Sequence, residues 1–189
     1  MPLHPEQIRA LAYARKRGTD APVESIRERV AATYADFEAL VDGTPASLAR
    51  QSRSATEWSV QEVVDHLVES DRAAIEQLSQ LFSGQSCAVP IPASLQSQHP
   101  RDLDWDALRH QFRTVHENVL ALLAKATDDI PLSATAAVQM VVKCADAEGN
   151  MRPVSWIEHF DWKAYSILLH AHNREHIAQT QRILSDSSR

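Results

Sequence analysis

Four long stretches of this sequence repeat apolar residues every three or four positions, and this spacing constrains the fold more than any other feature. It places the apolar side chains on one face of an α-helix, and that face has to be buried against other elements. The stretches cover about residues 23–41, 60–82, 104–127 and 155–184, and most of the prolines lie outside them. With only 4 glycines in 189 residues, an architecture rich in strands and tight turns is not expected. The sequence therefore predicts an all-α fold, a four-helix bundle.

Local signals indicate where two of these helices begin and what lies before the last one. Ser59 and Glu62 have the spacing of a capping box, in which each side chain binds the other residue's backbone N–H. The same four-residue pattern recurs from Ser155, so the last helix is expected to begin near that residue. Ahead of it, residues 138–145 and 151–155 alternate in polarity around turn-forming residues. They predict a short β-hairpin between the third and fourth helices.

The chain is expected to form one domain, residues 22–189, preceded by an N-terminal arm over residues 1–21. A short helix is expected within the arm, around residues 5–17. No apolar run approaches the roughly 20 residues that span a membrane, and the N-terminus lacks the apolar centre of a signal peptide. The loop of residues 83–100, rich in Ser, Gln and Pro, is long enough to be a functional or mobile segment.

Charge and cysteine content narrow the classes of partner. The formal net charge is −6, from 19 basic and 25 acidic residues. Because no basic excess or basic stripe is present, neither nucleic acid nor a membrane is expected as a partner. The two cysteines, Cys87 and Cys144, are too few for a disulfide framework or a thiolate zinc cage, and both are expected to be reduced. These features predict a cytoplasmic protein that acts on a small molecule.

The last predicted helix carries polar residues where its buried face should be apolar. Steps of three and four residues lead through Glu158, Trp162, Tyr165, Leu169, His172, His176, Gln179 and Ile183. A buried polar group without a partner costs about 1–3 kcal/mol. One metal ion can satisfy both His172 and His176, because residues four apart share a helix face. The alternative is two histidines that have other partners or are exposed.

A metal ion inside a bundle also needs a ligand from a facing helix. His66 is the only histidine in the second predicted helix, and small side chains in line with it leave room for an ion or a substrate. On these grounds alone, His66 could equally be a half-buried surface residue. The remaining six histidines are expected to be surface or half-buried residues: His4, His99, His110, His116, His159 and His170.

Two segments around these histidines resemble the signature segments of the DinB-like (YfiT-like) superfamily. They are WSVQEVVDHL at residues 58–67 and HNREHIAQ at residues 172–179. Each motif alone is loose, whereas the two in this order, about a hundred residues apart, are fairly specific. The resemblance covers about residues 22–185. It implies a four-helix bundle that binds a divalent ion (Zn, Ni, Mn or Fe) with positions open to water or substrate.

Carried onto this sequence, the resemblance implies His66, His172 and His176 as metal ligands, with Gln179 as a group behind them. Members of the superfamily include thiol-dependent transferases and isomerases that use bacillithiol, mycothiol or glutathione, and others described as metal-dependent hydrolases. A low-molecular-weight thiol is therefore a candidate cofactor, and an electrophilic small molecule is the candidate substrate. Glu175, next to a predicted ligand, is the candidate catalytic base or orienting group. A homodimer is a candidate assembly, because related bundles often pair through helix faces.

Two other functions fit parts of the pattern. Residues 172–176 match the inverted H-x-x-E-H signature of some zinc peptidases, but those need a further ligand well downstream, and only residues 177–189 follow. A non-enzymatic bundle that binds a metal or sequesters a ligand under stress needs no catalytic group. Metal removal separates the alternatives, because loss of a structural ion unfolds a protein and loss of a catalytic ion leaves it folded.

Overall fold

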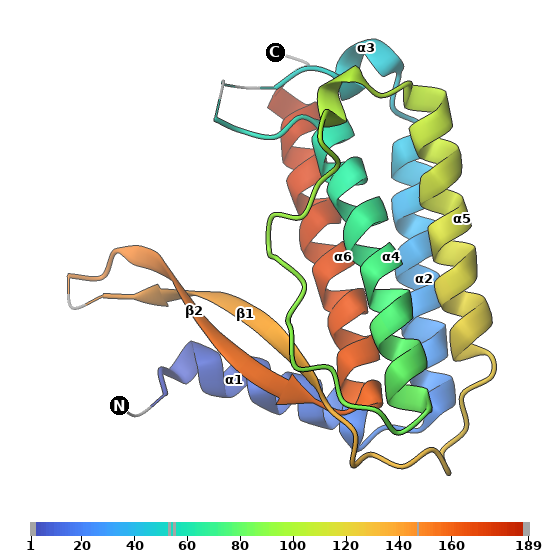
Figure 1. The fold of residues 1–189 in the computed structure, drawn as a ribbon. Coiled ribbons are helices and arrows are strands. Elements are labelled where there is room, and N and C mark those ends of the chain that lie inside the picture. The colour runs from blue at the N-terminus through green and yellow to red at the C-terminus, as the bar shows by residue number, and fades with distance from the viewer. Residues whose placement is uncertain (1–2, 53, 55, 147, 187–189) are drawn as a thin grey trace.

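Four long helices pack side by side in the computed structural model, which describes residues 3–52, 54, 56–146 and 148–186 (Figure 1). They are α2 (Val23–Asp42), α4 (Val60–Phe82), α5 (Trp105–Leu123) and α6 (Trp162–Asp186). The predicted four-helix bundle is confirmed. The ends of the predicted arm and domain, residues 1–2 and 187–189, lie outside the described residues. No helix in the described ranges combines the length and apolarity that crossing a bilayer requires.

N-terminal caps explain where α4 and α5 begin, and burial of apolar side chains explains which helix faces point into the bundle. Ser59 caps α4, because its hydroxyl accepts the Glu62 N–H at 3.2 Å and the Glu62 carboxylate accepts the Ser59 N–H at 2.9 Å. Asp104 caps α5 by accepting a backbone N–H three residues further on, at 2.8 Å. In the core, Phe37 of α2 meets Phe112 of α5 edge to face, with ring centres 5.2 Å apart. The apolar faces predicted from the spacing therefore meet inside the bundle.

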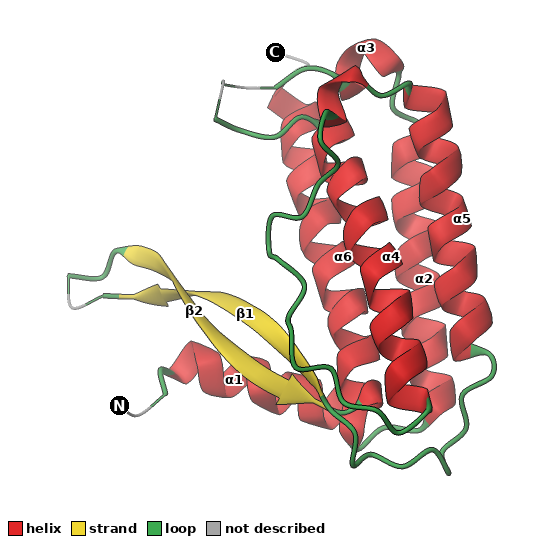
Figure 2. Cartoon of the chain, viewed as in Figure 1, coloured by secondary structure: helices red, strands yellow, loops and turns green. Residues whose placement is uncertain are grey.

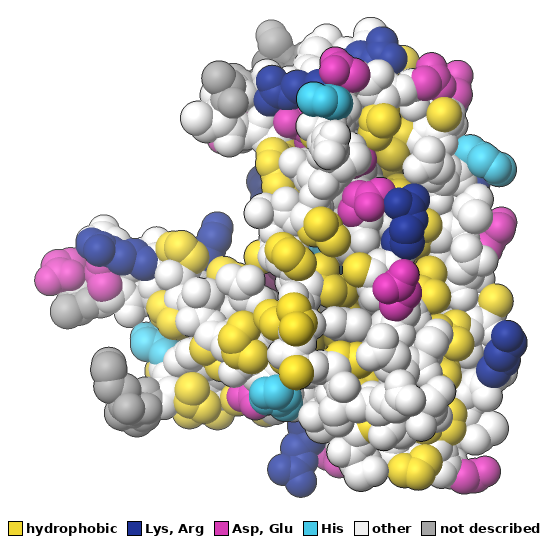
Figure 3. Space-filling view, in the orientation of Figure 1, with side chains coloured by type: hydrophobic (Ala, Val, Ile, Leu, Met, Phe, Trp, Pro, Cys, Tyr) yellow, Lys and Arg dark blue, Asp and Glu magenta, His cyan; other side chains and the backbone are white. Residues whose placement is uncertain are grey.

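A β-hairpin projects from the bundle beside α1 (Pro5–Ala14), as Figure 2 shows. Its strands, β1 (Ala136–Ala145) and β2 (Met151–Phe160), are antiparallel. At its base, Cys87 donates its N–H to the carbonyl of Thr135 at 2.9 Å and accepts the N–H of Ala137 at 2.8 Å. Hydrophobic side chains gather where the hairpin meets the bundle, and charged side chains lie near its tip (Figure 3). The predicted hairpin is confirmed, with a longer second strand than expected.

The last helix begins later than the sequence predicts. Ser155 and Glu158, expected to cap it, lie in β2, which pairs along its whole length with β1. The cap is Asp161, whose Oδ1 accepts the N–H groups of Lys163 at 2.9 Å and Ala164 at 3.0 Å. The prediction of a helix from Ser155, with Glu158 on its buried face, was therefore wrong. The capping pattern at Ser155 is local, whereas the ten-residue antiparallel pairing with β1 holds the segment in a strand and leaves no signal near Ser155 in the sequence.

Replacing Asp161 with Ala is expected to lower the free energy of unfolding by about 1–2 kcal/mol, because α6 loses its N-terminal cap. The other carboxylate oxygen of Asp161 also accepts the Thr19 hydroxyl, at 2.5 Å. Ser155→Ala is the matched control, and its effect is expected to stay within about 0.5 kcal/mol. Urea unfolding of both variants measures the difference. Equal losses in the two variants would contradict the assignment of the cap to Asp161.

The short helix expected around residues 5–17 is present as α1, and it continues into a single π-helical segment, Arg15–Thr19. This segment packs against the first turn of α6. Gly18 is buried there, and a Cβ atom at this position would lie 2.4 Å from the Cα of Ala164. The close approach of two backbones requires glycine at this position. The boundary between arm and bundle at residue 21 stays a prediction.

Candidate metal centre

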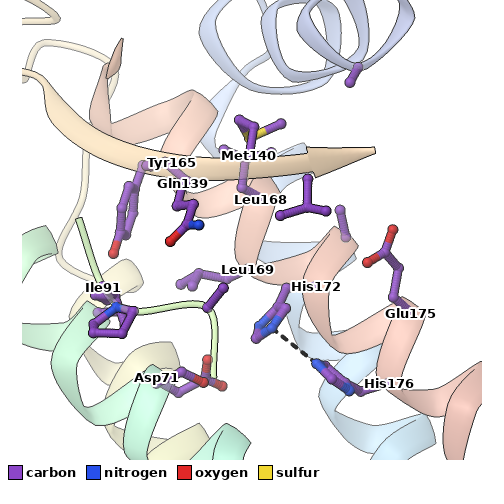
Figure 4. Close-up of a pocket in the computed structure, with 18 of the residues that line it drawn as sticks. Asp71, Ile91, Gln139, Met140, Tyr165, Leu168, Leu169, His172, Glu175 and His176 are labelled. Carbon is purple, nitrogen blue, oxygen red and sulfur yellow. Dashed lines mark hydrogen bonds between the residues drawn. The ribbon is translucent and has the colours of Figure 1, made fainter. Parts of the chain in front are cut away.

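Three imidazole rings from two helices converge on the face between α4 and α6. His66 lies on α4, and His172 and His176 lie one turn apart on α6. Nε2 of His172 is 3.1 Å from Nε2 of His66 and 3.1 Å from Nε2 of His176. Figure 4 shows the His172 and His176 rings pointing toward each other from α6. The structure thus brings together the three histidines that the sequence singled out.

Hydrogen bonds behind two of the rings determine which nitrogen faces the centre. Nδ1 of His66 lies 2.8 Å from the carbonyl oxygen of Leu95, and Nδ1 of His176 lies 2.8 Å from Oε1 of Gln179. Both partners are acceptors, so the Nδ1 atoms carry the protons and the Nε2 lone pairs face His172. Nε2 of His172 carries at most one proton, so it can donate a hydrogen bond to only one of the two Nε2 lone pairs that face it. A cation among the three nitrogens satisfies every lone pair at once.

Burial keeps all three rings neutral. Desolvation lowers the pKa of His66, and it lowers the pKa of His172 to well below the ordinary value with added repulsion from His176 and His66. Desolvation and the nearby His66 lower the pKa of His176 to about 4. Neutral imidazole is the form that binds metal ions. The rings are therefore in the ligand form at neutral pH.

The nitrogen separations suit one shared ion. Zn–N bonds of about 2.0–2.1 Å at tetrahedral angles place two ligand nitrogens roughly 3.4 Å apart. The observed separations are 3.1 Å for two pairs, and one ring nitrogen from each of the three histidines lies within 4.8 Å of the other two. Three protein ligands are also the number found in catalytic zinc sites, where the fourth position takes water or substrate. The residues present therefore fit a divalent ion.

The Trp58 ring packs beside two of the three histidine rings. The centre of its ring system lies 5.1 Å from that of His66 and 6.4 Å from that of His176, and it is nearly parallel to the latter. Trp162, the other tryptophan near the histidines in the sequence pattern, is instead buried in the core with its ring edge to face against Phe82. Only the tertiary structure separates these two roles, because both tryptophans lie next to apolar helical patterns.

The long loop of residues 83–100 reaches the centre directly. Its Leu95 carbonyl holds the ring of His66, and its Ser97 N–H donates to Oδ2 of Asp65 at 2.9 Å. Sequence reasoning missed Leu95, because a backbone carbonyl leaves no signal in the residue type. The loop therefore orients a candidate ligand from outside the bundle.

A pocket of about 470 Å³ opens beside the three histidines, between α4, α6 and β1. Every residue of β1 from Ala137 to Val142 lines it, so the hairpin forms one wall of this pocket. Tyr165 lies on the side away from the histidines (Figure 4), and its hydroxyl donates to Oε1 of Gln77 at 2.7 Å. The remaining wall is mostly apolar. A small molecule with an apolar body and a polar end suits such a pocket.

Glu175 lines the same pocket but is not bonded to the histidines. Its side chain is exposed, and in Figure 4 its carboxylate points toward β1. Although solvent reaches the side chain, the pocket wall partly desolvates the carboxylate and raises its pKa, against the opposing effect of Lys143. A carboxylate of raised pKa at a pocket edge is suited to accepting a proton.

His116 departs from the expectation of a surface or half-buried residue. It is 1% exposed, its ring stacks on Tyr34 at 3.7 Å, and its Nδ1 lies 2.7 Å from Oε1 of Glu38. Its Nε2 faces the buried Asp71 at 3.9 Å, and burial raises the pKa of that carboxyl group. The surface assignment of His116 was wrong because Tyr34 and Glu38, both on α2, supply its partners. The sequence of α5, the helix that carries His116, does not indicate these partners.

Comparisons with known proteins agree with this geometry. The sequence profile of the DinB superfamily matches residues 29–155, a segment that contains His66 and ends before α6. No curated protein matches the sequence. Among solved structures, YfiT from Bacillus subtilis aligns with a TM-score of 0.65 and 15% identity, covering 88% of this chain and 87% of that one. YfiT is described as "a probable metal-dependent hydrolase with an unusual four-helix bundle topology".

A mycothiol-dependent maleylpyruvate isomerase aligns with a TM-score of 0.58 and 13% identity, covering 86% of this chain and 60% of that one. A mutant of this isomerase aligns with a TM-score of 0.57 and 12% identity. At these identities the likeness to solved structures shows a shared fold. The profile match, in contrast, spans more than half of the sequence. The chain therefore belongs to the DinB superfamily.

Proposed function

We propose that this protein is a metal-dependent enzyme in which His66, His172 and His176 hold one divalent ion, Zn, Ni, Mn or Fe. The observation that carries the proposal is the convergence of three neutral imidazole nitrogens, two of them 3.1 Å from the third, at the wall of a mostly apolar pocket. An ion held there supplies Lewis acidity and lowers the pKa of a bound water or thiol. The proposed reaction is attack of a small thiol or water on an electrophilic small molecule.

The residues around the centre have separate tasks in this proposal. The Leu95 carbonyl and Gln179 side chain orient the His66 and His176 rings. The apolar wall formed by β1 excludes water and binds the apolar body of the substrate. Glu175 is the proposed base, which accepts the proton of the nucleophile at the pocket edge.

A turnover assay with and without thiol tests the proposal. Protein loaded with Zn²⁺, Ni²⁺, Mn²⁺ or Fe²⁺ is incubated with maleylpyruvate, a chlorodinitrobenzene or an activated ester, together with mycothiol, bacillithiol, glutathione or no thiol. Turnover that needs both metal and thiol supports a transferase or isomerase, as the likeness to the mycothiol-dependent isomerase suggests. Metal-dependent turnover without thiol supports a hydrolase, as the likeness to YfiT suggests. No metal-dependent turnover in any combination would contradict the enzymatic proposal.

Glu175→Gln in the same assay is expected to lower kcat by about 10²-fold or more, because general base catalysis contributes about 10²–10⁴-fold. Its metal content is expected to stay at the wild-type level, because no hydrogen bond joins Glu175 to the three histidines in the described ranges. Glu117→Gln is the matched control, since Glu117 is exposed on α5 and does not line the pocket. Equal kcat values for the two variants would rule out Glu175 as the base.

A non-enzymatic metal-binding or ligand-sequestering bundle is the second candidate. The observation that favours it is that the three histidines join α4 to α6, as a structural ion would. Thermal melting with and without a chelator distinguishes the two. Cooperative melting after metal removal supports a catalytic ion, and loss of the folded state supports a structural one. A cytoplasmic location and a homodimer stay predictions from the sequence.

A further inference from the structure

A second group of metal-ligating side chains lies where the beginning of α1 meets the outer end of β1. His4 directly precedes α1, Glu6 lies in its first turn, and Cys144 is next to the last residue of β1. One ligand atom from each of the three residues lies within 4.8 Å of the others. Nδ1 of His4 and Oε2 of Glu6 are in direct contact. None of the three residues lines the pocket beside His172.

The atoms that face one another in this group are hidden from solvent. Cys144 is a free cysteine and is 4% exposed. Nδ1 of His4 and Oε2 of Glu6 are buried as well and face each other, while the other carboxylate oxygen of Glu6 pairs with Arg9. Buried polar atoms are nearly always satisfied in folded proteins. His4 and Glu6 are polar partners of each other, and a cation placed among the three ligand atoms can bind the imidazole, the carboxylate and the thiolate together.

Regular secondary structure positions each member of the group. The backbone N–H of His4 donates to Oε1 of Gln7 at 2.8 Å, which fixes the entry into α1. Cys144 is held opposite Arg152 in the ladder of the hairpin. Burial and the neighbouring Glu6 raise the pKa of the Cys144 thiol, and Arg9 opposes that rise. An ionised thiol beside the carboxylate is therefore unfavourable, unless a cation lies between them.

We propose that His4, Glu6 and Cys144 form a second metal site, which binds Zn²⁺ through one thiolate, one imidazole and one carboxylate. These are the three ligand types that zinc takes from proteins, and the thiolate disfavours hard ions such as Mg²⁺ and Ca²⁺. When the ion binds, the thiol proton leaves to solvent and no electron is transferred. The site uses none of the residues of the three-histidine centre and does not depend on the proposed function.

The second site would join the two elements that cover the pocket. α1 contributes Ala10 and Tyr13 to the pocket wall, and β1 contributes Ala137 to Val142. An ion bound to His4 and Glu6 at one end of α1 and to Cys144 on β1 ties these two segments together. The consequence is that zinc at this site stabilises the wall of the pocket beside the three histidines.

Cobalt distinguishes the two sites, because a thiolate ligand gives Co²⁺ an intense near-ultraviolet charge-transfer absorption that imidazole does not. Full-length metal-free protein, titrated with Co²⁺ under reducing conditions, is expected to bind two equivalents and to show the thiolate absorption. Cys144→Ser is expected to bind one equivalent and to lose this absorption. His172→Ala is also expected to bind one equivalent, but to keep it.

Cys87→Ser is the matched control, because Cys87 is the other free, buried cysteine. It is expected to keep both equivalents and the thiolate absorption. His4→Ala is expected to weaken Co²⁺ binding at the second site by at least about tenfold. Circular dichroism shows whether each variant is folded. The proposal would be overturned by wild-type protein without thiolate absorption, by absorption that survives in folded Cys144→Ser, or by unchanged Co²⁺ affinity in His4→Ala.

Discussion

Replacing His172 with Ala is expected to remove the metal from the three-histidine centre and to leave the protein folded. Its Nε2 is the atom that both other rings approach, at 3.1 Å each. Without it, two nitrogens from separate helices remain. We expect the metal affinity of this centre to fall at least about 100-fold, because losing a ligand costs more affinity than losing a group that only orients a ligand. Metal content after dialysis, measured by mass spectrometry on untagged protein, gives the result.

His170→Ala is the control for this experiment. His170 lies on the same helix, but its Nδ1 faces α2, 2.7 Å from the Thr33 hydroxyl oxygen and 3.2 Å from the Arg29 carbonyl oxygen. This variant is expected to keep the wild-type metal content. His66→Ala and His176→Ala are expected to behave like His172→Ala. Wild-type metal content in all three variants would refute the assignment of these histidines as ligands.

Replacing Gly18 with Ala is expected to destabilise the protein by about 1–3 kcal/mol or more, which is the cost of overpacking a closely packed contact. The added Cβ atom would lie 2.4 Å from the Cα of Ala164 and 2.8 Å from the carbonyl oxygen of Lys163. Both are backbone atoms in the first turn of α6, so no side-chain rotation can relieve the clash. Thermal unfolding should show a Tm decrease of roughly 2–4 °C per kcal/mol.

Gly43→Ala provides the comparison for Gly18→Ala. Gly43 ends α2 with a φ of −73°, and its added Cβ atom would meet its nearest neighbour, the carbonyl oxygen of Ala39, at 3.4 Å. Its effect is expected to stay within about 0.5 kcal/mol. If both variants lost the same stability, the loss would come from the general effect of replacing glycine. The close contact between Gly18 and α6 would then not account for the loss of stability in Gly18→Ala.

Much of the bundle could be predicted because the signals lie within single segments. The Ser59 capping box and the apolar spacing that follows it depend on residues a few positions apart, and the structure begins α4 there. The start of α6 was missed for the opposite reason. Ser155 has a local capping pattern, but β1 pairs with its segment, and nothing near Ser155 in the sequence reports that pairing.

The candidate site divides in the same way. His172 and His176 stood out because they interrupt the apolar face of one helix, and His66 joined them through the helix arrangement and the superfamily resemblance. The Leu95 carbonyl behind His66 and the β1 wall of the pocket had no such signal. Each depends on a segment that reaches the centre from elsewhere in the chain.

The sequence by itself determined that the long helices each present an apolar face and that His172 and His176 interrupt one of those faces, because both follow from helical spacing. The tertiary structure decided which side chains meet across elements: His116 with Tyr34, and Cys144 with His4. These contacts join residues far apart in the chain. Packing between whole elements brings such residues together, and that packing has no local pattern in the sequence.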